Sequence, residues 1–278
     1  FTTVWYQAIV IYGTPAEEDS GGKIIMNANG FFNDIDIALM FHGMTATVVD
    51  IRSYAMMQFE VEFHGKSSHA ALFPYEGRSA MDALILAFNG IEFLRKHVKD
   101  DCRMHYTMLN SVGPANVVSD YAKGGFIIRS YSYSYLRNLE ERFINVIKGA
   151  ALMTGTTYTI HKDVEYMPKV PVFKLNDLLM ENAKIVHAPN IKPPIEQSGS
   201  TDFATVPGSV IRVAFAPEEA SVHSKEFLLA GKSEAANNAI IIAGKIIAAT
   251  CYELISDSKL MDEIKSEFKI NKEKMNNI

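Results

Sequence analysis

The hydrophobic pattern at the start of the chain is that of a buried parallel sheet. Residues 8–12 form an unbroken apolar run, residues 35–41 form a second one, and residues 22–32 between them suit a short helix. Unbroken apolar runs are typical of strands that are covered on both faces. A strand, a helix and a strand in this order predict a parallel crossover unit, so we expect the chain to open with an α/β domain.

The pattern changes at about residue 55. Polar and apolar residues alternate over residues 58–63, as they do in a strand with one face in water. Helical spacing follows over residues 78–97 and 136–154, and strand patterns cover residues 102–109, 124–133 and 157–166. The order β-α-β-β-α-β predicts a ferredoxin-like α+β unit over residues 55–167.

The α/β pattern resumes at residue 168. Helical patterns cover residues 175–187, a second helix is expected to begin after a Ser233 cap and to reach residue 252, and a last amphipathic helix follows. An apolar strand is expected at residues 210–215. We therefore predict an α/β domain of residues 1–54 and 168–278, interrupted by the ferredoxin-like insertion.

Composition excludes several classes of function. The 278 residues are 48% hydrophobic and carry a formal net charge of -5. Because no dense stripe of Lys and Arg occurs, neither nucleic acid nor an anionic membrane is expected as a partner. Cys102 and Cys251 are far apart in the sequence, which predicts neither a disulfide scaffold nor a thiolate zinc site and favours a cytoplasmic location. No uninterrupted apolar stretch reaches the length of a membrane span.

Adjacent carboxylates at the end of the first apolar run indicate chemistry. Glu17, Glu18 and Asp19 follow the turn at residues 13–16. Carboxylates side by side repel one another, and their burial is costly unless a cation or a proton compensates. Acidic residues could also cap the next helix, an alternative that stays open for Asp19. For Glu17 and Glu18 we favour a metal site at a strand-to-helix corner.

Histidines supply further candidate ligands. His42 ends the second apolar run, and His223 lies in a loop after the strand expected at residues 210–215. The carboxyl ends of neighbouring strands form a common crevice, and imidazole with carboxylate suits zinc or manganese. His69 differs, because it lies in the small-residue loop 65–71 of the insertion and reaches such a crevice only if the insertion folds over a site.

Three polar features of the chain each have two interpretations. The loop 199–203, Gly-Ser-Thr-Asp-Phe, either caps a helix through Ser200 or Thr201 or holds a substrate carboxylate on its N–H groups and hydroxyls. Arg129 interrupts an apolar strand. It is either a charge on the solvent-exposed face of that strand or a residue that binds an anion. Asn116, in Gly-Pro-Ala-Asn, is by default a turn residue.

Together these motifs resemble the aminoacylase-like metallopeptidases, and within them the amidohydrolase subgroup, most of all the dipeptidases that split β-alanyl-lysine and related dipeptides. The resemblance rests on Gly-Thr-Pro-Ala-Glu-Glu before Gly-Gly-Lys, His42 after an apolar strand, Gly-Lys-Ser-Ser-His-Ala-Ala, Gly-Ser-Thr-Asp-Phe and a late His-Ser-x-Glu-Phe, which occur in the family's order. It implies a zinc-peptidase-like α/β catalytic domain that carries an inserted ferredoxin-like domain, which serves as lid and as dimerisation domain.

The resemblance also implies a role for each matched residue. Glu17 would be the general base that activates a metal-bound water. Glu18, His42 and His223 would be ligands in a site for two divalent metal ions, for which zinc is the expected metal and manganese is the second candidate. His69 would steady the developing oxyanion, in the neighbouring subunit of a homodimer formed through the lid. Asn116 and Arg129 would bind the terminal carboxylate of a dipeptide or N-acyl amino acid, and Gly199, Ser200 and Thr201 would line the same pocket.

The chain also departs from the family pattern. Gly43 follows His42 where the subgroup has proline, and the family's first metal motif, a histidine with a bridging cysteine or aspartate, has no counterpart in this sequence. We therefore expect the chain to be the C-terminal part of a larger metal-dependent hydrolase and to bind metal weakly and partially. The alternative is a non-catalytic dimerisation or small-molecule-binding protein on the same scaffold.

Overall fold

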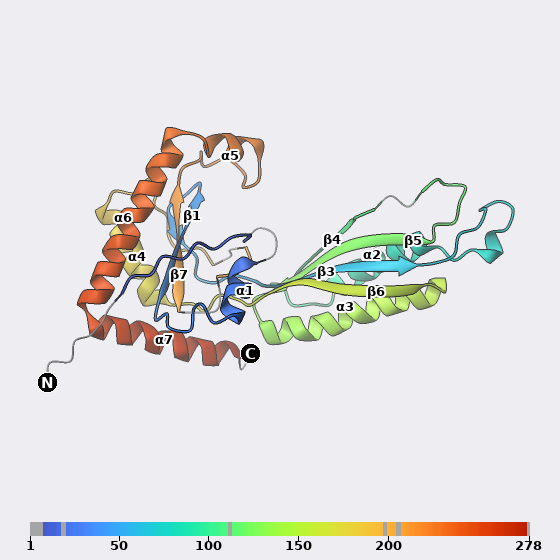
Figure 1. Cartoon of the computed structure of the whole chain (residues 1–278), viewed down its shortest axis with the longest axis horizontal. Coiled ribbons are helices and arrows are strands. Elements are labelled where there is room, and N and C mark those ends of the chain that lie inside the picture. The colour runs from blue at the N-terminus through green and yellow to red at the C-terminus, as the bar shows by residue number, and fades with distance from the viewer. Residues whose placement is uncertain (1–7, 18–20, 111–112, 197–198, 204–206, 277–278) are drawn as a thin grey trace. The chain divides into compact units, whose positions relative to one another are not determined.

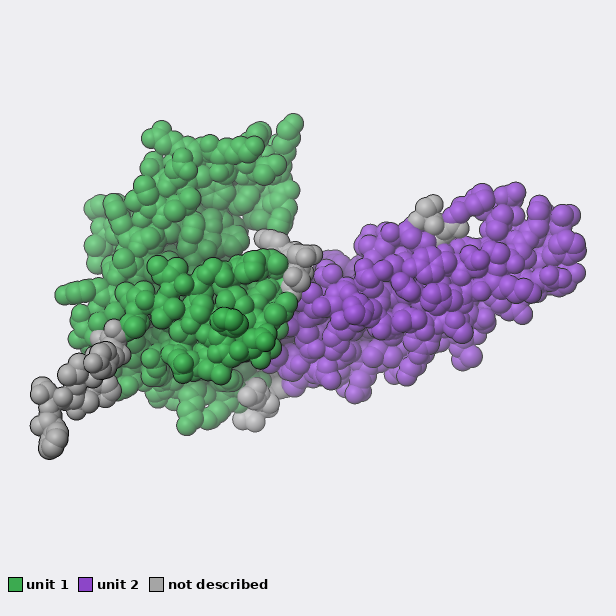
Figure 2. Space-filling view, viewed as in Figure 1, with its two compact units in different colours: residues 1–53, 169–277 green, residues 54–168, 278 purple. Residues whose placement is uncertain are grey.

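The structure of the chain is a computed structural model that describes residues 8–17, 21–110, 113–196, 199–203 and 207–276 (Figure 1). Contacts between residues divide the chain into two compact units (Figure 2). Unit 1 combines residues 1–53 with residues 169–277, and unit 2 is formed by residues 54–168. The chain therefore leaves unit 1 once and returns to it once.

Unit 1 is a small sheet with helices. The strand order is β1-β7-β2, in which β1 (Ala38–Met44) runs parallel to β7 (Gly208–Ala214) and β2 (Val48–Val49) runs antiparallel to it. The described helices of unit 1 are α1 (Gly22–Ala28), α4 (Phe173–Ile185), α5 (Lys225–Ala230), α6 (Glu234–Ser256) and α7 (Ser258–Asn276).

The core of unit 1 forms where α4 and α6 meet the sheet. Leu179 of α4, Ala243 of α6 and Ile211 of β7 are buried together in one apolar cluster. Helix α6 begins where the sequence predicts, because the Ser233 side chain accepts a hydrogen bond from the Ala236 N–H at 3.2 Å. Among the described residues, α6 is also long and apolar enough to cross a membrane, a property that core helices of soluble domains share.

Unit 2 is a four-stranded antiparallel sheet with two long helices. Its elements are β3 (Ala55–His64), the short 3-10 helix η1 (Pro74–Glu76), α2 (Ala80–Arg95), β4 (Arg103–Met108), β5 (Tyr121–Ser130), α3 (Tyr133–Thr154) and β6 (Thr157–Tyr166). The strand order is β4-β5-β3-β6. Together with the chain order β-α-β-β-α-β, this is the predicted ferredoxin-like topology.

Aromatic side chains fill the core of unit 2. The Phe59 and Phe143 rings stack with centroids 4.8 Å apart, and the Phe126 ring lies 5.3 Å from that of Phe143. Alternation along β3 and β5 turns one side chain in two toward α2 and α3, which explains how a sheet with polar positions in every strand still has an apolar core.

One prediction for unit 1 is wrong. Residues 8–12 form no strand, and Ile9 and Ile11 are 63% and 93% exposed. No strand of the described chain pairs with this run, so its apolar side chains remain in contact with solvent. The second apolar run does form a strand, but β1 pairs in parallel with β7 from the far end of the chain. The fold class is α/β as predicted, without the expected crossover from residues 8–12.

Candidate functional site

The acidic turn before α1 has a tightly constrained backbone. The Gly21 N–H donates to the Ala16 carbonyl at 2.9 Å, and both residues have positive φ, 64° and 57°. A Cβ atom at Gly22 would lie 1.9 Å from the Pro15 carbonyl oxygen, so only glycine fits there. Glu17 lies half-buried in this turn. The turn therefore fixes the approach of Glu17 to the N-terminus of α1.

A buried ion pair joins the start of α1 to the loop 199–203. The Lys23 ammonium donates to one carboxylate oxygen of Asp202 at 2.9 Å, and the Lys23 backbone N–H donates to the other at 3.0 Å. The Asp202 side chain is fully buried and that of Lys23 is 9% exposed. Each charge compensates the desolvation of the other, so the two segments are held together.

The loop that this ion pair holds contains an unsatisfied hydroxyl. The Ser200 hydroxyl is buried and has no hydrogen-bond partner among the described residues, while the Thr201 hydroxyl accepts from the Phe203 N–H at 3.3 Å. Gly199 is exposed. A buried polar group without a partner is rare in folded proteins, and a ligand is one explanation for it. The structure thus brings the turn of Glu17 and the loop 199–201 to the same end of α1.

Of the two candidate ligand histidines, His223 lies in the loop after β7 as predicted, and His42 does not lie where the sequence pattern indicates. His42 lies within β1, in register with Arg212 of β7, and not at the end of the strand as predicted, because β1 extends to Met44. Its Nδ1 lies 2.7 Å from the Gly43 carbonyl oxygen. If Nδ1 donates to that carbonyl, the acceptor lone pair is on Nε2, an arrangement common in metal-binding histidines. His223 is exposed at the turn before α5, with a φ of 66°.

A metal site is only partly supported by these residues. Glu18 lies outside the described residues, so no distance joins it to His42 or His223. Within the described ranges, no three His, Cys, Asp or Glu side chains gather closely enough to hold a metal ion. The donor types suit zinc or manganese, but the described residues do not by themselves form a closed site.

In unit 2, the structure brings His69 and Asn116 together. The backbone of His69 bridges to Val117, and the Ala70 N–H donates to the Asn116 carbonyl at 3.0 Å. The exposed His69 ring accepts at Nδ1 from the N–H groups of Ala71 and Leu72, both at 3.3 Å. This fixes the tautomer, because an accepting Nδ1 leaves the proton on Nε2. His69 can therefore donate a hydrogen bond from Nε2.

Arg129 is not a simple charge on a wet face. Its Nε is buried and makes no hydrogen bond within the described part of the chain. Burial lowers the pKa of the Arg129 guanidinium, and the nearby Tyr54 and Tyr166 partly oppose this. In the register of the sheet it lies between Met56 of β3 and Arg103 of β4. A half-buried cation whose Nε–H has no partner in the described chain is suited to bind an anion.

A buried polar network was not predicted from the sequence. The Lys169 ammonium donates to the Asp50 carbonyl oxygen at 2.8 Å, and Arg212 binds the Asp50 carboxylate through Nε and Nη2 at 2.8 and 2.7 Å. Burial lowers the pKa of Lys169 to about 8. Ser53 is the last residue of unit 1 before the chain enters unit 2, and Lys169 is the first residue after the chain returns. The Ser53 hydroxyl accepts a hydrogen bond from the Lys169 backbone N–H at 2.9 Å. The network therefore fixes both chain crossings on unit 1.

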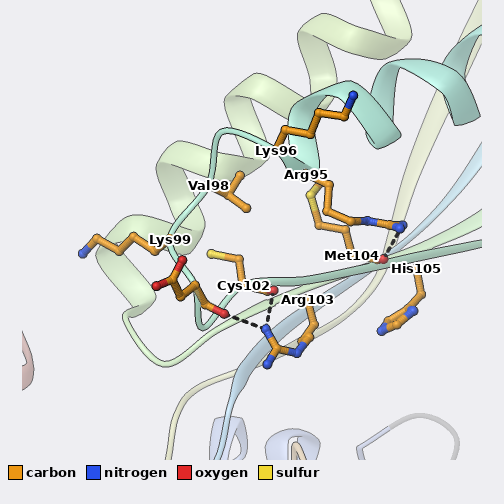
Figure 3. Close-up of a pocket in the computed structure, with 9 residues that line it drawn as sticks. Arg95, Lys96, Val98, Lys99, Cys102, Arg103, Met104 and His105 are labelled. Carbon is orange, nitrogen blue, oxygen red and sulfur yellow. Dashed lines mark hydrogen bonds between the residues drawn. The ribbon is translucent and has the colours of Figure 1, made fainter.

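The sequence analysis also missed the pairing of Lys23 with Asp202 and the placement of Arg103 and His105 on one face of β4 (Figure 3). Lys23 and Asp202 were visible as members of short motifs, but no local pattern pairs residues so far apart in the chain. Arg103 and His105 alternate with apolar Met104 and Tyr106, a signal that was available in the strand pattern. The alternation shows that Arg103 and His105 share one face of a strand, but it does not show that this strand pairs with β5.

Comparison with known proteins shows what the chain is similar to. Residues 51–152 match the peptidase dimerisation domain of the M20 peptidases. The chain is 30% identical over 269 residues to Xaa-Arg dipeptidase of Mus musculus, covering 94% of this chain and 62% of the relative. It is 28% identical over 317 residues to one component of the p-aminobenzoyl-glutamate hydrolase of Escherichia coli (strain K12), covering 92% and 66%. The chain thus spans about 62% of the length of the first of these relatives.

A solved structure shows the same fold. The aminobenzoyl-glutamate utilization protein from Klebsiella pneumoniae superposes with a TM-score of 0.62 at 22% identity, over 86% of this chain and 60% of that one. The motifs, the inserted ferredoxin-like unit and these matches agree with one another. Residues 51–152 therefore match an M20 peptidase dimerisation domain, and the chain over most of its length is similar to the relatives named above.

Proposed function

We propose that the chain serves in the metal-dependent hydrolysis of an amide bond in a dipeptide or an N-acyl amino acid. Relatives with amide-hydrolase names support this, namely Xaa-Arg dipeptidase and p-aminobenzoyl-glutamate hydrolase. The observation that carries the proposal is the Lys23–Asp202 ion pair, which holds the turn of Glu17 and the unsatisfied Ser200 hydroxyl at one end of α1. A proton acceptor beside a ligand-binding loop is what amide hydrolysis requires.

The proposal gives each residue of unit 1 a task. Glu17 takes the proton from the attacking water and passes it to the leaving nitrogen. Glu18, His42 and His223 hold divalent metal, zinc or manganese, which polarises the amide and acidifies water when bound. Gly199, Ser200 and Thr201 receive the substrate through N–H groups and hydroxyls.

The residues of unit 2 complete the proposal. His69 and Asn116 act in the site of the neighbouring protomer, because Asn116 precedes β5 and Arg129 lies near the other end of that strand. There His69 donates its Nε2 proton to the oxyanion, and Asn116 joins Arg129 in binding the terminal carboxylate. Because residues 51–152 match a dimerisation domain, we propose a homodimer in which this unit makes the contact between protomers. A cytoplasmic location and a small-molecule substrate, with no nucleic acid or membrane as partner, are part of the same proposal. Light scattering of the purified chain tests the dimer directly.

The experiment that tests the activity is a hydrolysis assay on β-alanyl-lysine and on N-acetyl amino acids, with added Zn²⁺ or Mn²⁺ and with a chelator. Glu17→Gln removes the base at nearly unchanged shape, and we expect kcat to fall by about 10² to 10⁴-fold. Glu141→Gln, an exposed residue of α3, is the matched control and leaves kcat unchanged.

The alternative to catalysis is a non-catalytic binding or dimerisation protein on the same scaffold. It is motivated by the departure from the family pattern, because the family's first metal motif has no counterpart in this sequence. A folded dimer that binds N-acetyl amino acids but shows no turnover with either metal supports this alternative and contradicts the enzyme. Turnover that is equal in the native chain and in Glu17→Gln contradicts the assigned base.

A further inference from the structure

The glycine after His42 leaves room for an aromatic ring. Gly43 stands where the subgroup that the motifs resemble has proline. A Cβ atom at Gly43 would lie 2.7 Å from Cε1 and 2.9 Å from Cδ1 of Phe215, the residue that follows β7. Because interiors are close-packed, a larger residue at position 43 would displace the Phe215 ring. The departure from the family pattern at Gly43 therefore matches a contact within this chain.

The Phe215 ring also contacts α5. Its centroid lies 4.9 Å from that of Phe227, with the ring planes at 64°, an edge-to-face arrangement that aromatic pairs prefer. A Cβ atom at Gly231, the residue after α5, would lie 4.0 Å from Cε2 of the same ring. The backbone is held as well, since the Phe215 N–H donates to the Met44 carbonyl at the end of β1 at 2.8 Å. The half-buried Phe215 ring therefore lies between β1 and α5.

Both sides of this aromatic contact adjoin a proposed metal ligand. On β1, the Gly43 carbonyl oxygen lies 2.7 Å from Nδ1 of His42. On α5, the Ser224 hydroxyl accepts from the Phe227 N–H at 3.1 Å, and the helix begins directly after this cap, which follows His223. A series of direct contacts therefore joins His42 to His223 within unit 1.

The backbone of His223 depends on this support. Its φ of 66° is a conformation that residues other than glycine keep only where the surrounding structure holds them. The His223 side chain is exposed, so no packing of its own fixes it. Its position is therefore set by the cap of α5 and by the Phe227 ring that packs on Phe215.

We propose that Phe215 is a positioning residue for the metal site: its ring holds α5 against β1 and so sets His223 relative to His42. This deepens the proposed function and rests on it, because there both histidines are metal ligands. Ligands on separate segments bind a metal tightly only where the structure holds them in place beforehand, which lowers the entropic cost of binding. Gly43 takes part by leaving room for the ring.

Calorimetric titration of the full chain with Zn²⁺ tests the proposal without turnover. Phe215→Leu removes the ring but keeps an apolar side chain. We expect the affinity for Zn²⁺ to fall about ten-fold, the lower end of the loss when a residue that orients a ligand is replaced. In a His223→Ala background the same substitution should leave the affinity unchanged, because Phe215 then has no ligand to position. A residue with only a stabilising role would give the same factor in both backgrounds.

Phe88→Leu is the matched control. Phe88 is also half-buried and packs against the core of its own unit, and its ring stacks on that of Tyr106 at 4.3 Å, but in unit 2. Its replacement should destabilise unit 2 and leave the affinity for Zn²⁺ unchanged. Gly43→Ala places a Cβ atom where the Phe215 ring lies and should weaken Zn²⁺ binding as Phe215→Leu does.

The NMR signals of the His223 ring measure the same coupling without metal, and they decide alone if the chain binds no Zn²⁺. They should shift in Phe215→Leu and in Gly43→Ala, which is far from His223 in sequence, and stay in place in Phe88→Leu. If Phe215→Leu fails to fold, Gly43→Ala carries both measurements.

Three outcomes overturn the proposal: an unchanged Zn²⁺ affinity in Phe215→Leu, an equal loss of affinity with and without His223, or His223 ring signals that do not move. Failure of the proposed function would look different. A native chain that hydrolyses no amide substrate but keeps the coupling between Phe215 and His223 contradicts the hydrolysis and leaves the positioning role standing.

Discussion

The two units differ in where most of their charged side chains lie. Unit 1 buries ionic groups with partners: Lys23 with Asp202, Arg212 with Asp50, and Lys169 on a carbonyl oxygen. Unit 2 has an apolar core and carries its charges around it, and its buried Glu140 is paired with Lys162 and Arg137. Arg129 departs from both patterns, because its Nε is buried and has no hydrogen-bond partner in the described chain. A buried charge with a partner indicates a structural role, and an unsatisfied one indicates a ligand.

The largest predicted effect comes from breaking a buried pair in unit 1. Asp202→Ala leaves the Lys23 ammonium buried without its carboxylate, and we expect the free energy of unfolding to fall by about 3 to 5 kcal/mol. The apolar double variant Lys23→Met/Asp202→Leu recovers most of this loss, because it removes the buried charge altogether. Urea denaturation of the native chain, both single variants and the double variant gives the coupling energy.

The same variants separate a structural role from a functional one. If the double variant regains stability but turnover stays low, the ion pair positions Glu17 and the loop 199–201. If Asp202→Ala costs less than about 1 kcal/mol, the value of an exposed pair, then Lys23 and Asp202 do not form the buried contact described above.

The second prediction concerns the pH dependence of Lys169. Its pKa is about 8 in the folded chain, below the ordinary 10.5, so between these values the unfolded chain binds more protons and stability rises with pH. Relative to Lys169→Met, the free energy of unfolding of the native chain should rise by about 2 to 3 kcal/mol from about pH 7 to about pH 10. Urea titrations at several pH values measure this difference, and parallel curves for the two proteins would contradict it.

The sequence predicted unit 2 more completely than unit 1, for a physical reason. In unit 2 each strand pairs with another from the same continuous segment, and alternation in residues 58–63 directly reflects which face is buried. In unit 1, β1 pairs with β7 from the far end of the chain. Local periodicity predicts strands but not their partners, so residues 8–12 were wrongly given a place in the sheet.

The same limit applies to the candidate site. Glu17, His69 and Asn116 lie in short motifs whose composition suggests chemistry. The structure shows that His69 and Asn116 are neighbours within unit 2. Lys23 and Asp202 are far apart in sequence, and their pairing depends on tertiary packing. His42 was placed at the end of a strand because an apolar run does not show how far β1 continues.

The smallest predicted effect tests whether the two units are independent. Ser79 caps α2 by accepting from the Asp82 N–H at 3.0 Å in unit 2, and Ser233 caps α6 at 3.2 Å in unit 1. Replacing either serine with alanine should cost about 1 kcal/mol. Since each unit has its own core, calorimetry should resolve two transitions, with Ser79→Ala moving one and Ser233→Ala the other. A single transition that both variants shift alike would mean that the partnered charges of unit 1 and the apolar core of unit 2 stabilise one cooperative structure.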